Sequence, residues 1–389
     1  MRIGLFTNNY RPLVNGLATS VDTFASAFRK QGHHVVVVAP RYPGGADESG
    51  VLRVPGFRAP THHAYVLPLP QTPGLARAVA RLDLDIFHAQ HPYLLGPAAA
   101  RWARRAGKPL VFTYHTRYER YAHYLPGPAR WTAWLALRRA LAFANQADLV
   151  VVPARTLVAE LQHQGVRRRI AVVPTGVWLG PAAAAATDSA HLGLQTAGPL
   201  CLAVGRLAPE KNQSFLLHAF ARLLGELPSA RLSLVGEGDD RTRLERLARG
   251  LGIQAAVRFH GSVPHEAVGD YYRAADLFLF PSTSETQGLV ILEALAAGLP
   301  VAAVASPASL EVLRDGETGL ILPEDPAAFA RGVTEAWRRP DRGRGLGEQG
   351  RRVAAAYTAE ACAARLLDLY RELVPARQPD RLSLVQDLR

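Results

Sequence analysis

The feature that most constrains the fold of this 389-residue chain is the alternation of short apolar runs with longer segments of helical spacing. The apolar runs predict two series of strands, at residues 3–7, 35–39, 86–90, 110–115, 149–153 and 170–174, and then at 202–204, 232–235, 257–259, 277–280, 301–304 and 319–322. Strands that alternate with helices form parallel sheets with helices on both faces. The sequence therefore predicts an α/β protein of two tandem Rossmann-like domains that face a cleft.

The chain length agrees with two domains, because a single hydrophobic core rarely serves so many residues. The stretch 180–186 has low complexity, with one Gly, one Pro and five Ala, and is predicted to be a linker. We place the first domain at residues 1–180 and the second at 181–358. A final helix and a charged tail at 359–389 complete the chain.

Composition indicates a globular protein without a membrane span or a disulfide. No stretch approaches the roughly 20 apolar residues that span a bilayer. Met1 leads directly into a predicted strand rather than a signal peptide, so we expect a cytoplasmic protein. Cys201 and Cys362 lie in apolar surroundings without metal-ligand spacing, and we expect both to be buried thiols.

The excess positive charge belongs to the first half of the chain. Residues 1–180 contain 22 Lys and Arg against 8 Asp and Glu, a net of +14, whereas residues 181–389 contain 23 against 25, a net of −2. A basic face of this size suggests an anionic partner, which could be nucleic acid, an anionic membrane or an anionic acceptor.

Two motifs that follow predicted strands of the second half indicate an anion site. The first, Gly-Arg-Leu-Ala-Pro-Glu-Lys-Asn, places Arg206 and Lys211 on a loop where both can face one anion. In the second, Glu285 lies in a strand-to-helix loop and Glu293 about one turn inside the helix, whose N-terminus near Leu289 offers unpaired N–H groups. Because a carboxylate beside an anion site cannot itself bind phosphate, we expect it to accept hydrogen bonds from hydroxyl groups. Hydroxyls next to phosphate suggest a nucleotide sugar.

These motifs resemble those of the family 4 retaining glycosyltransferases, and the resemblance covers nearly the whole chain. The other landmarks occur in the family's order: a glycine loop at 15–20, Gly-Glu-Gly at 236–238, Phe-His-Gly at 259–261 and Ala-Ala-Gly-Leu-Pro-Val at 296–301. Where most members carry Glu-Gly-Phe-Gly, this chain has Glu285-Thr286-Gln287-Gly288. That variant, like Thr-Tyr-His-Thr-Arg-Tyr-Glu at 113–119, is similar to bacterial glucosyltransferases that act on diacylglycerol.

The resemblance implies a GT-B fold in which residues 1–180 bind the acceptor, residues 181–358 bind the nucleotide sugar, and the last helix crosses back to the first domain. It also implies transfer with retention at the anomeric carbon, with no metal and no cofactor besides the donor substrate. The residues to which it assigns catalysis are His115, Arg206, Lys211 and Glu285. Those to which it assigns donor binding are Gly16, Arg206, Lys211, Gly261, Glu285, Gly288, Leu289, Val290 and Glu293.

A segment that contains two tryptophans suggests how the acceptor is reached. At helical spacing Trp131, Trp134 and Arg138 share one face, which combines interfacial aromatic rings with a cation. Arg117 and Tyr118 belong to the motif shared with lipid-acting enzymes, and Arg-Trp-Ala-Arg-Arg at 101–105 repeats the mixed composition. Two interpretations stay open: the tryptophans meet an anionic membrane, or they pack in the core.

The predicted function is the transfer of a hexose, with glucose favoured, from a nucleotide diphosphate sugar to a membrane lipid such as diacylglycerol. UDP-glucose is the first candidate donor, ahead of UDP-galactose and GDP-mannose. We expect peripheral association with the inner face of the cell membrane and no nucleic-acid partner. Three alternatives remain: a soluble glycosyltransferase acting on a sugar or polysaccharide, a non-catalytic nucleic-acid-binding protein, and a sugar-nucleotide epimerase.

Motifs that could hold a metal are weak in this chain. Asp83-Leu84-Asp85 matches a short metal motif of other glycosyltransferases, but it precedes its strand, so we expect a turn or cap at the opposite edge of the sheet. The pairs His33-His34 and His62-His63 have no identifiable partner ligands.

Overall fold

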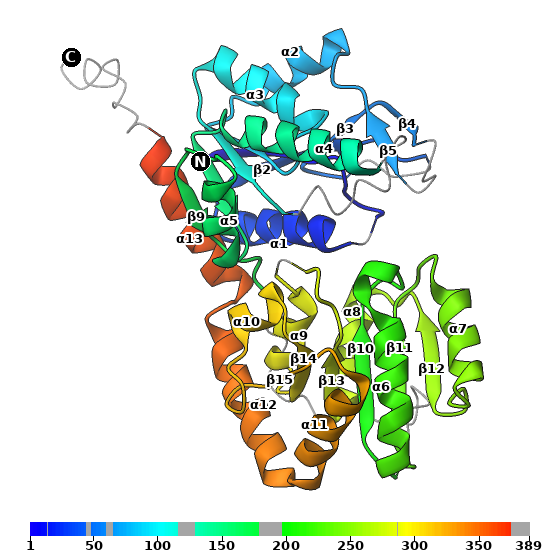
Figure 1. Cartoon of the computed structure of the whole chain (residues 1–389). Coiled ribbons are helices and arrows are strands. Elements are labelled where there is room, and N and C mark those ends of the chain that lie inside the picture. The colour runs from blue at the N-terminus through cyan, green and yellow to red at the C-terminus, as the bar shows by residue number, and fades with distance from the viewer. Residues whose placement is uncertain are drawn as a thin grey trace, which may run out of the picture. The chain divides into compact units, whose positions relative to one another are not determined.

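The computed structural model describes residues 1–13, 15–43, 48–59, 65–115, 129–178, 197–285 and 287–374. The chain forms two compact units (Figure 1). Unit 1 comprises Met1–Val151, Gln164–Ala171 and the described residues from Ala363 onward, and unit 2 comprises Val152–His163 and the described part of Val172–Cys362. Each unit has its own parallel sheet, which confirms the predicted α/β class with two Rossmann-like sheets.

Unit 1 has a parallel sheet that contains, within the described residues, seven strands in the order β3-β2-β1-β6-β7-β8-β9. The elements up to the end of this sheet are β1 (Arg2–Phe6), α1 (Gly16–Lys30), β2 (His34–Pro40), β3 (Val51–Val54), β4 (Gly56–Arg58), β5 (Val66–Pro68), α2 (Pro73–Arg81), β6 (Ile86–Ala89), α3 (Leu95–Ala106), β7 (Leu110–Thr113), α4 (Ala129–Ala144), β8 (Leu149–Val152), α5 (Thr156–His163) and β9 (Ile170–Val172). Helix α5 belongs to unit 2. Strands β4 and β5 form a separate antiparallel pair.

Unit 2 has a sheet with, among the described residues, six strands in the order β12-β11-β10-β13-β14-β15. The elements are β10 (Leu200–Val204), η2 (Pro209–Lys211), α6 (Gln213–Glu226), β11 (Arg231–Val235), α7 (Arg241–Gly250), β12 (Val257–Gly261), α8 (His265–Ala274), β13 (Leu277–Phe280), α9 (Leu289–Ala296), β14 (Val301–Val304), α10 (Pro307–Val312), β15 (Leu320–Leu322), α11 (Pro326–Arg338), α12 (Pro340–Ala355) and α13 (Ala359–Leu373). The residues of α13 from Ala363 onward belong to unit 1.

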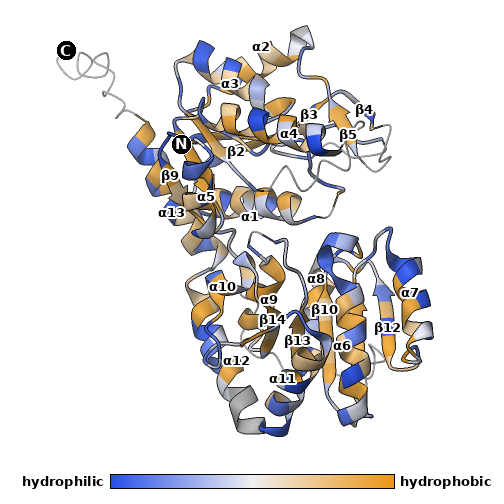
Figure 2. Cartoon of the chain, in the orientation of Figure 1, coloured by the Kyte–Doolittle hydropathy of each residue, from blue (hydrophilic) through white to orange (hydrophobic). Residues whose placement is uncertain are grey.

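The central strands form because they are apolar on both faces. All four residues are buried in each of β6, β7, β8 and β13, as expected for parallel strands covered by helices on both sides. Burying one such Leu or Phe side chain contributes roughly 1.5–3 kcal/mol relative to leaving it exposed. The strands are largely orange in Figure 2, whereas the surrounding helices have both orange and blue faces.

In both sheets the strand order reverses at the centre. The chain runs outward from β1 to β2 and β3, and then in the other direction from β6 to β9, so the reversal lies between β1 and β6. In unit 2 the equivalent reversal lies between β10 and β13. Ligands of open α/β sheets bind beside the carboxyl ends of the two strands that flank such a switch point.

The helix α13 returns to the sheet of unit 1 through a buried hydrogen bond. The Tyr370 hydroxyl lies 2.5 Å from His88 Nδ1, and His88 Nε2 lies 2.6 Å from Thr113 Oγ1. No helix within the described residues combines the length and the apolar character needed to cross a membrane.

Candidate functional site

The loop after β10 carries the first two predicted site residues, Arg206 and Lys211. It begins at Gly205 with φ of 151° and ends at Asn212, which has a φ of 60° and precedes α6. Gly236, just after β11, passes so close that a Cβ atom on it would lie 2.0 Å from the Gly205 carbonyl oxygen. Because only glycine fits this approach, the neighbouring strand constrains the path of the loop that holds both cations.

The loop after β13 is tied to this first loop by hydrogen bonds. Ser284 Oγ donates to the Glu210 carbonyl at 2.8 Å, although the two residues are 74 positions apart. Asn212 Nδ2 donates to the Pro281 carbonyl at 3.2 Å. Since β10 and β13 are the strands that flank the switch point, the two sequence motifs meet at the place where a ligand is expected.

Lys211 and Glu285 form an ion pair across these loops. Lys211 Nζ lies 2.5 Å from Glu285 Oε1, and the side chains are 22% and 21% exposed. Both residues, with Gly205 and Ser282, line a pocket at the carboxyl ends of β10 and β13. Arg206 pairs with Glu210 in its own loop. A polyanion bound here would compete with Glu285 for the Lys211 ammonium group.

Helix α9 begins at this same edge of the sheet. Gly288 precedes it with φ of 65°, a conformation that favours glycine. Leu289 and Val290 open the first turn, which contains no acidic residue. The free N–H groups and the positive end of the helix dipole are therefore available to an anion.

Glu293 lies in the second turn of α9 and accepts a hydrogen bond from the buried Tyr272 hydroxyl at 2.8 Å. Burial, and then the negative charge of Glu293, raises the pKa of Tyr272 well above its usual value, so the phenol keeps its proton. Gly261 ends β12 with φ of 76°, on the edge strand of the sheet. The structure thus groups the other donor-binding candidates of unit 2 around β10, β13 and α9, with Gly261 at the edge.

In unit 1 the β1–α1 loop leads to Gly16. Asn15 caps α1 by accepting a hydrogen bond from Ala18 N at 2.9 Å, and a Cβ atom on Gly16 would meet nothing within 4 Å. The Asn8 side chain links this loop to the chain after β6, because its Nδ2 donates to the Tyr93 carbonyl at 3.0 Å. Gly16 therefore lies at the start of a capped helix beside open space, as an anion-binding glycine requires.

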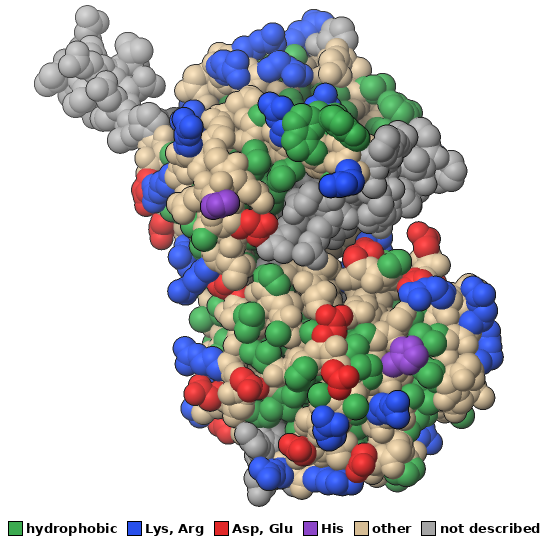
Figure 3. Space-filling view, in the orientation of Figure 1, with side chains coloured by type: hydrophobic (Ala, Val, Ile, Leu, Met, Phe, Trp, Pro, Cys, Tyr) green, Lys and Arg blue, Asp and Glu red, His purple; other side chains and the backbone are tan. Residues whose placement is uncertain are grey.

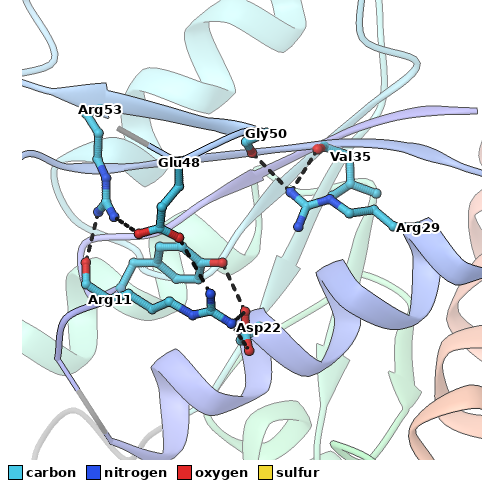
Figure 4. A network of polar contacts seen from close by, with 8 residues as sticks. Arg11, Asp22, Arg29, Val35, Glu48, Gly50 and Arg53 are labelled. Carbon is cyan, nitrogen blue, oxygen red and sulfur yellow. Dashed lines mark hydrogen bonds and ion pairs between the residues drawn. The ribbon is translucent and has the colours of Figure 1, made fainter. Parts of the chain in front are cut away.

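A polar network holds the segment that precedes Gly16 (Figure 4). Arg11 pairs with Asp22 of α1 at 2.6 Å and with Glu48 at 3.6 Å. Arg53, whose side chain is only 5% exposed, pairs with Glu48 at 2.7 Å and donates to the Arg11 carbonyl at 2.9 Å. The buried Tyr10 hydroxyl donates to Asp22 at 3.1 Å. Two acids and two arginines thus fix the loop without a net charge of their own.

His115 follows β7 and lies near two further histidines of the carboxyl edge. His115 Nε2 lies 2.7 Å from Gln90 Oε1, and His91 Nδ1 accepts from Asn8 N at 3.2 Å. Burial lowers the pKa of His115, and burial followed by the charge of His115 lowers those of His88 and His91, in each case to about 3. All three imidazoles are therefore neutral near pH 7, and His115 can serve as a hydrogen-bonding group rather than as a cation.

Comparisons with known proteins agree with this arrangement. The family described as "Glycosyltransferase Family 4" matches residues 14–179, and that described as "Glycosyl transferases group 1" matches residues 185–353. The alpha-monoglucosyldiacylglycerol synthase of Streptococcus pneumoniae is 32% identical over 82% of this chain and 75% of its own length. The chain belongs to the family 4 glycosyltransferases. It is an enzyme that uses a nucleotide-sugar donor.

Other relatives of this glycosyltransferase carry different names. The GDP-mannose-dependent alpha-mannosyltransferase of Mycobacterium tuberculosis is 31% identical over 83% of this chain and 84% of its own length. The structure of sucrose-phosphate synthase from Thermosynechococcus elongatus superimposes with a TM-score of 0.79 at 25% identity, covering 95% of this chain and 98% of that one. The likeness confirms the predicted GT-B fold.

The tryptophans of α4 in this glycosyltransferase lie at the surface. Trp131 is 70% exposed, Trp134 is 49% exposed and Leu135 is 43% exposed. The Arg138 guanidinium lies 4.7 Å from the centre of the Trp134 ring. Figure 3 shows apolar side chains over α4 with Lys and Arg side chains beside them. The core interpretation is therefore wrong for both tryptophans of α4.

Trp102 of α3 behaves differently although its sequence neighbours are similar. It is 8% exposed, and its ring centre lies 5.8 Å from that of Phe6. Trp102 is a core residue. The segment 101–105 therefore does not share the exposed tryptophans of α4, although it has a similar composition. The other acceptor candidates, Arg117 and Tyr118, lie outside the described residues, as do the predicted linker at 180–186, His62 and His63.

The Asp83-Leu84-Asp85 motif holds the start of the first strand. Asp85 Oδ2 accepts from Arg2 N at 2.8 Å, and Asp83 forms an ion pair with the Arg2 side chain at 3.2 Å. Both carboxylates thus lie at the amino end of β1, the edge opposite the site residues. Within the described residues no three His, Cys, Asp or Glu side chains cluster in a way that could hold a metal ion.

Sequence reasoning missed several polar residues that contact the site residues. Gln90 faces His115, Tyr272 holds Glu293, and Gln287 is buried next to Gly288. The available signal was a polar residue directly after an apolar strand, as at Gln90, or directly before a helix-capping glycine, as at Gln287. Tyr272 offered no such signal, because its place in α8 is that of an ordinary core aromatic residue.

Proposed function

We propose that this glycosyltransferase transfers glucose from UDP-glucose to diacylglycerol at an anionic membrane surface, with retention at the anomeric carbon. The observation that carries the lipid acceptor is the exposed face of α4, where two tryptophans, Leu135 and Arg138 lie together. The name of the pneumococcal relative supports a glucosyl product on diacylglycerol. The Glu-Thr-Gln-Gly variant of the second motif, at residues 285–288, also supports a diacylglycerol acceptor.

The donor diphosphate is assigned to the edge of unit 2. Lys211 and Arg206 would neutralise its charge, and the N–H groups of Leu289 and Val290 would donate to its oxygens. Glu285 would then exchange part of its ion pair with Lys211 for hydroxyl groups of the sugar. Glu293, held by Tyr272, would accept from the ribose. Gly261 would allow close approach of the nucleotide at β12.

Unit 1 carries two further residues that the family resemblance assigns to donor binding or catalysis. At Gly16 the backbone N–H groups are open to an anion, since a Cβ atom there would meet nothing within 4 Å. A neutral His115 donates its Nε2–H to Gln90 Oε1, which sets the ring orientation, so Nδ1 would act as an acceptor for a hydroxyl group. The network of Arg11, Asp22, Glu48 and Arg53 would hold the Gly16 loop in place.

The reaction needs no cofactor in this scheme. The bond between the anomeric carbon and the diphosphate oxygen breaks, and the acceptor oxygen bonds to the same face of the sugar. The acceptor proton passes to the leaving diphosphate oxygen. Negative charge grows on the diphosphate as the bond breaks, so cations and N–H groups placed there stabilise the transition state more than the ground state.

Membrane binding is proposed to place α4 at the lipid headgroups. Arg130, Arg138 and Arg139 are all exposed, and each cation near an anionic bilayer contributes about 1 kcal/mol. The tryptophan rings prefer the interface between headgroups and acyl chains. Together these side chains would give reversible, salt-sensitive binding.

Flotation with liposomes tests the acceptor side. Wild-type protein should float with anionic phosphatidylglycerol vesicles and less with neutral phosphatidylcholine vesicles or at high salt. The double variant Trp131→Ser/Trp134→Ser should lose most of this binding. Leu310→Ser is the matched control, because Leu310 is an exposed apolar residue of unit 2, at 58% exposure. Equal flotation of the control and the double variant would remove α4 from the proposal.

A panel of nucleotide sugars tests the reaction itself. UDP-glucose, UDP-galactose and GDP-mannose are supplied with and without diacylglycerol in the liposomes, and products are identified by mass spectrometry. An α-glucosyl lipid made only with UDP-glucose and diacylglycerol supports the proposal. The mannosyltransferase relative at 31% identity makes mannose transfer from GDP-mannose the second candidate. Turnover with a sugar acceptor but no lipid product would favour a soluble acceptor instead.

A further inference from the structure

Gln287 makes an unusual pair of contacts for a residue in a ligand-binding loop. Its Oε1 accepts from Thr175 N at 2.9 Å, and its Nε2 donates to the Thr175 carbonyl at 2.7 Å. Both bonds are buried, and the side chain is only 7% exposed. A carboxamide is the uncharged side chain that can satisfy the N–H and the C=O of one residue together.

The contact joins two segments of unit 2 that are 112 positions apart. Gln287 lies between Glu285 and Gly288, whose conformation sets the start of α9. Thr175 lies in the chain that follows β9, two residues before Val177. Val177 is itself paired with the segment before α13, since its N donates to the Tyr357 carbonyl at 2.9 Å and its carbonyl accepts from Ala359 N at 2.9 Å.

The Glu285 loop is therefore held at both ends. Ser284 fastens its first part to the Glu210 carbonyl, and Gln287 fastens its last part to Thr175. Between these anchors lies Glu285, with its ion pair to Lys211, and directly after the second anchor comes Gly288, the glycine that precedes the first N–H groups of α9. Loss of the second anchor would free the backbone next to the helix start while leaving the ion pair possible.

We propose that Gln287 is a positioning residue for the donor diphosphate: its carboxamide holds the Glu285–Gly288 loop on Thr175 and so sets the direction of the N–H groups that begin α9. The proposal rests on the proposed assignment of the diphosphate to this helix start. Gln287 acts through the backbone of Gly288 and Leu289 and need not touch the donor. This role explains why a glutamine occupies position 287, since an apolar side chain would make neither of the two hydrogen bonds to Thr175.

The test compares Gln287→Met and Gln287→Glu with wild type. Methionine has a similar length but makes neither hydrogen bond, so affinity for UDP and kcat/KM for the donor should each fall about 10-fold or more. KM for the acceptor should change less than about twofold, because the acceptor does not use this helix start. Gln146→Met, at an exposed position two residues after the end of α4, is the matched control and should behave as wild type.

The glutamate variant adds a second measurement, the pH dependence of kcat/KM, which should not change if Gln287 only stabilises the fold. At neutral pH a carboxylate at position 287 still accepts from Thr175 N but repels the Thr175 carbonyl oxygen. Burial raises the pKa of such a carboxyl, and the protonated form regains a donor. The ratio of variant to wild-type kcat/KM should therefore rise as the pH falls from about 8 to about 6. The Met variant should show no such rise.

The outcomes separate the two proposals. UDP and GDP binding is measured by calorimetry on the full chain, and melting temperatures are recorded for every variant. If wild type binds a nucleotide and both Gln287 variants bind it equally well, the positioning role is overturned. It is also overturned if the Glu and Met variants lose activity to the same extent at every pH. If wild type binds neither UDP nor GDP, the assignment of the diphosphate to this site fails, and the positioning role fails with it.

Discussion

Acidification should destabilise unit 1 through its buried histidines. His88 is 1% exposed and His91 is 9% exposed, and burial lowers the pKa of each to about 3. In the unfolded chain a histidine has a pKa of about 6.5. Because the pKa is lower in the folded protein, the unfolded chain binds more protons than the folded protein once the pH falls below about 6.5. The free energy of unfolding therefore decreases as the pH falls.

The magnitude follows from this difference. Between about pH 7 and pH 5.5 each such histidine lowers the free energy of unfolding by about 1.3 kcal/mol, so the two together lower it by about 2.5 kcal/mol. The result is the same for any folded pKa below about 4.5, because such a group stays neutral over the whole interval. His115 contributes in the same direction. A loss of this size is a large part of the roughly 5–15 kcal/mol that stabilises a typical domain.

Urea unfolding at a series of pH values measures this effect, with fluorescence of the buried Trp102 as the reporter of unit 1. His88→Gln should weaken the pH dependence by roughly the share of one histidine, whatever it does to stability at neutral pH. His218→Gln, on the exposed face of α6, is the control and should leave the dependence unchanged. Equal stability at both ends of the pH interval, or the same slope in the His88 variant as in wild type, would refute the reasoning.

Three further predictions concern single residues of unit 2. Lys211→Ala should lower turnover by about 10²-fold or more, since it removes a cation from a growing anion; unchanged turnover in a steady-state assay removes Lys211 from the mechanism. Gly236→Ala should destabilise the protein by more than about 2 kcal/mol, because φ is 140° and the new Cβ would lie 2.0 Å from the Gly205 carbonyl oxygen; an unaltered urea midpoint contradicts this. Tyr272→Phe should raise the donor KM several-fold by releasing Glu293, which donor titrations of the variant would detect.

Local pattern was enough to predict most of the regular structure. The strands β13 and β14 begin and end where the apolar runs do, and α13 forms the predicted final helix from residue 359 onward. The strands β3, β4 and β5 were missed. All three residues of β4 are exposed and β5 has only three residues, so neither has the apolar run or the length from which a strand is recognised.

The sequence by itself predicted two tandem α/β domains from strand periodicity, and its ordered motifs resembled those of the GT-B glycosyltransferases, because both signals are local properties of the chain. Only the tertiary structure decided which residues meet. It brought Lys211 to Glu285 across 74 positions and Gln287 to Thr175 across 112. It also buried Trp102 while leaving Trp131 exposed, although both have arginine neighbours. The burial of a side chain and its pairing with another depend on which elements pack together. That packing follows from the strand order, which no single segment of the sequence specifies.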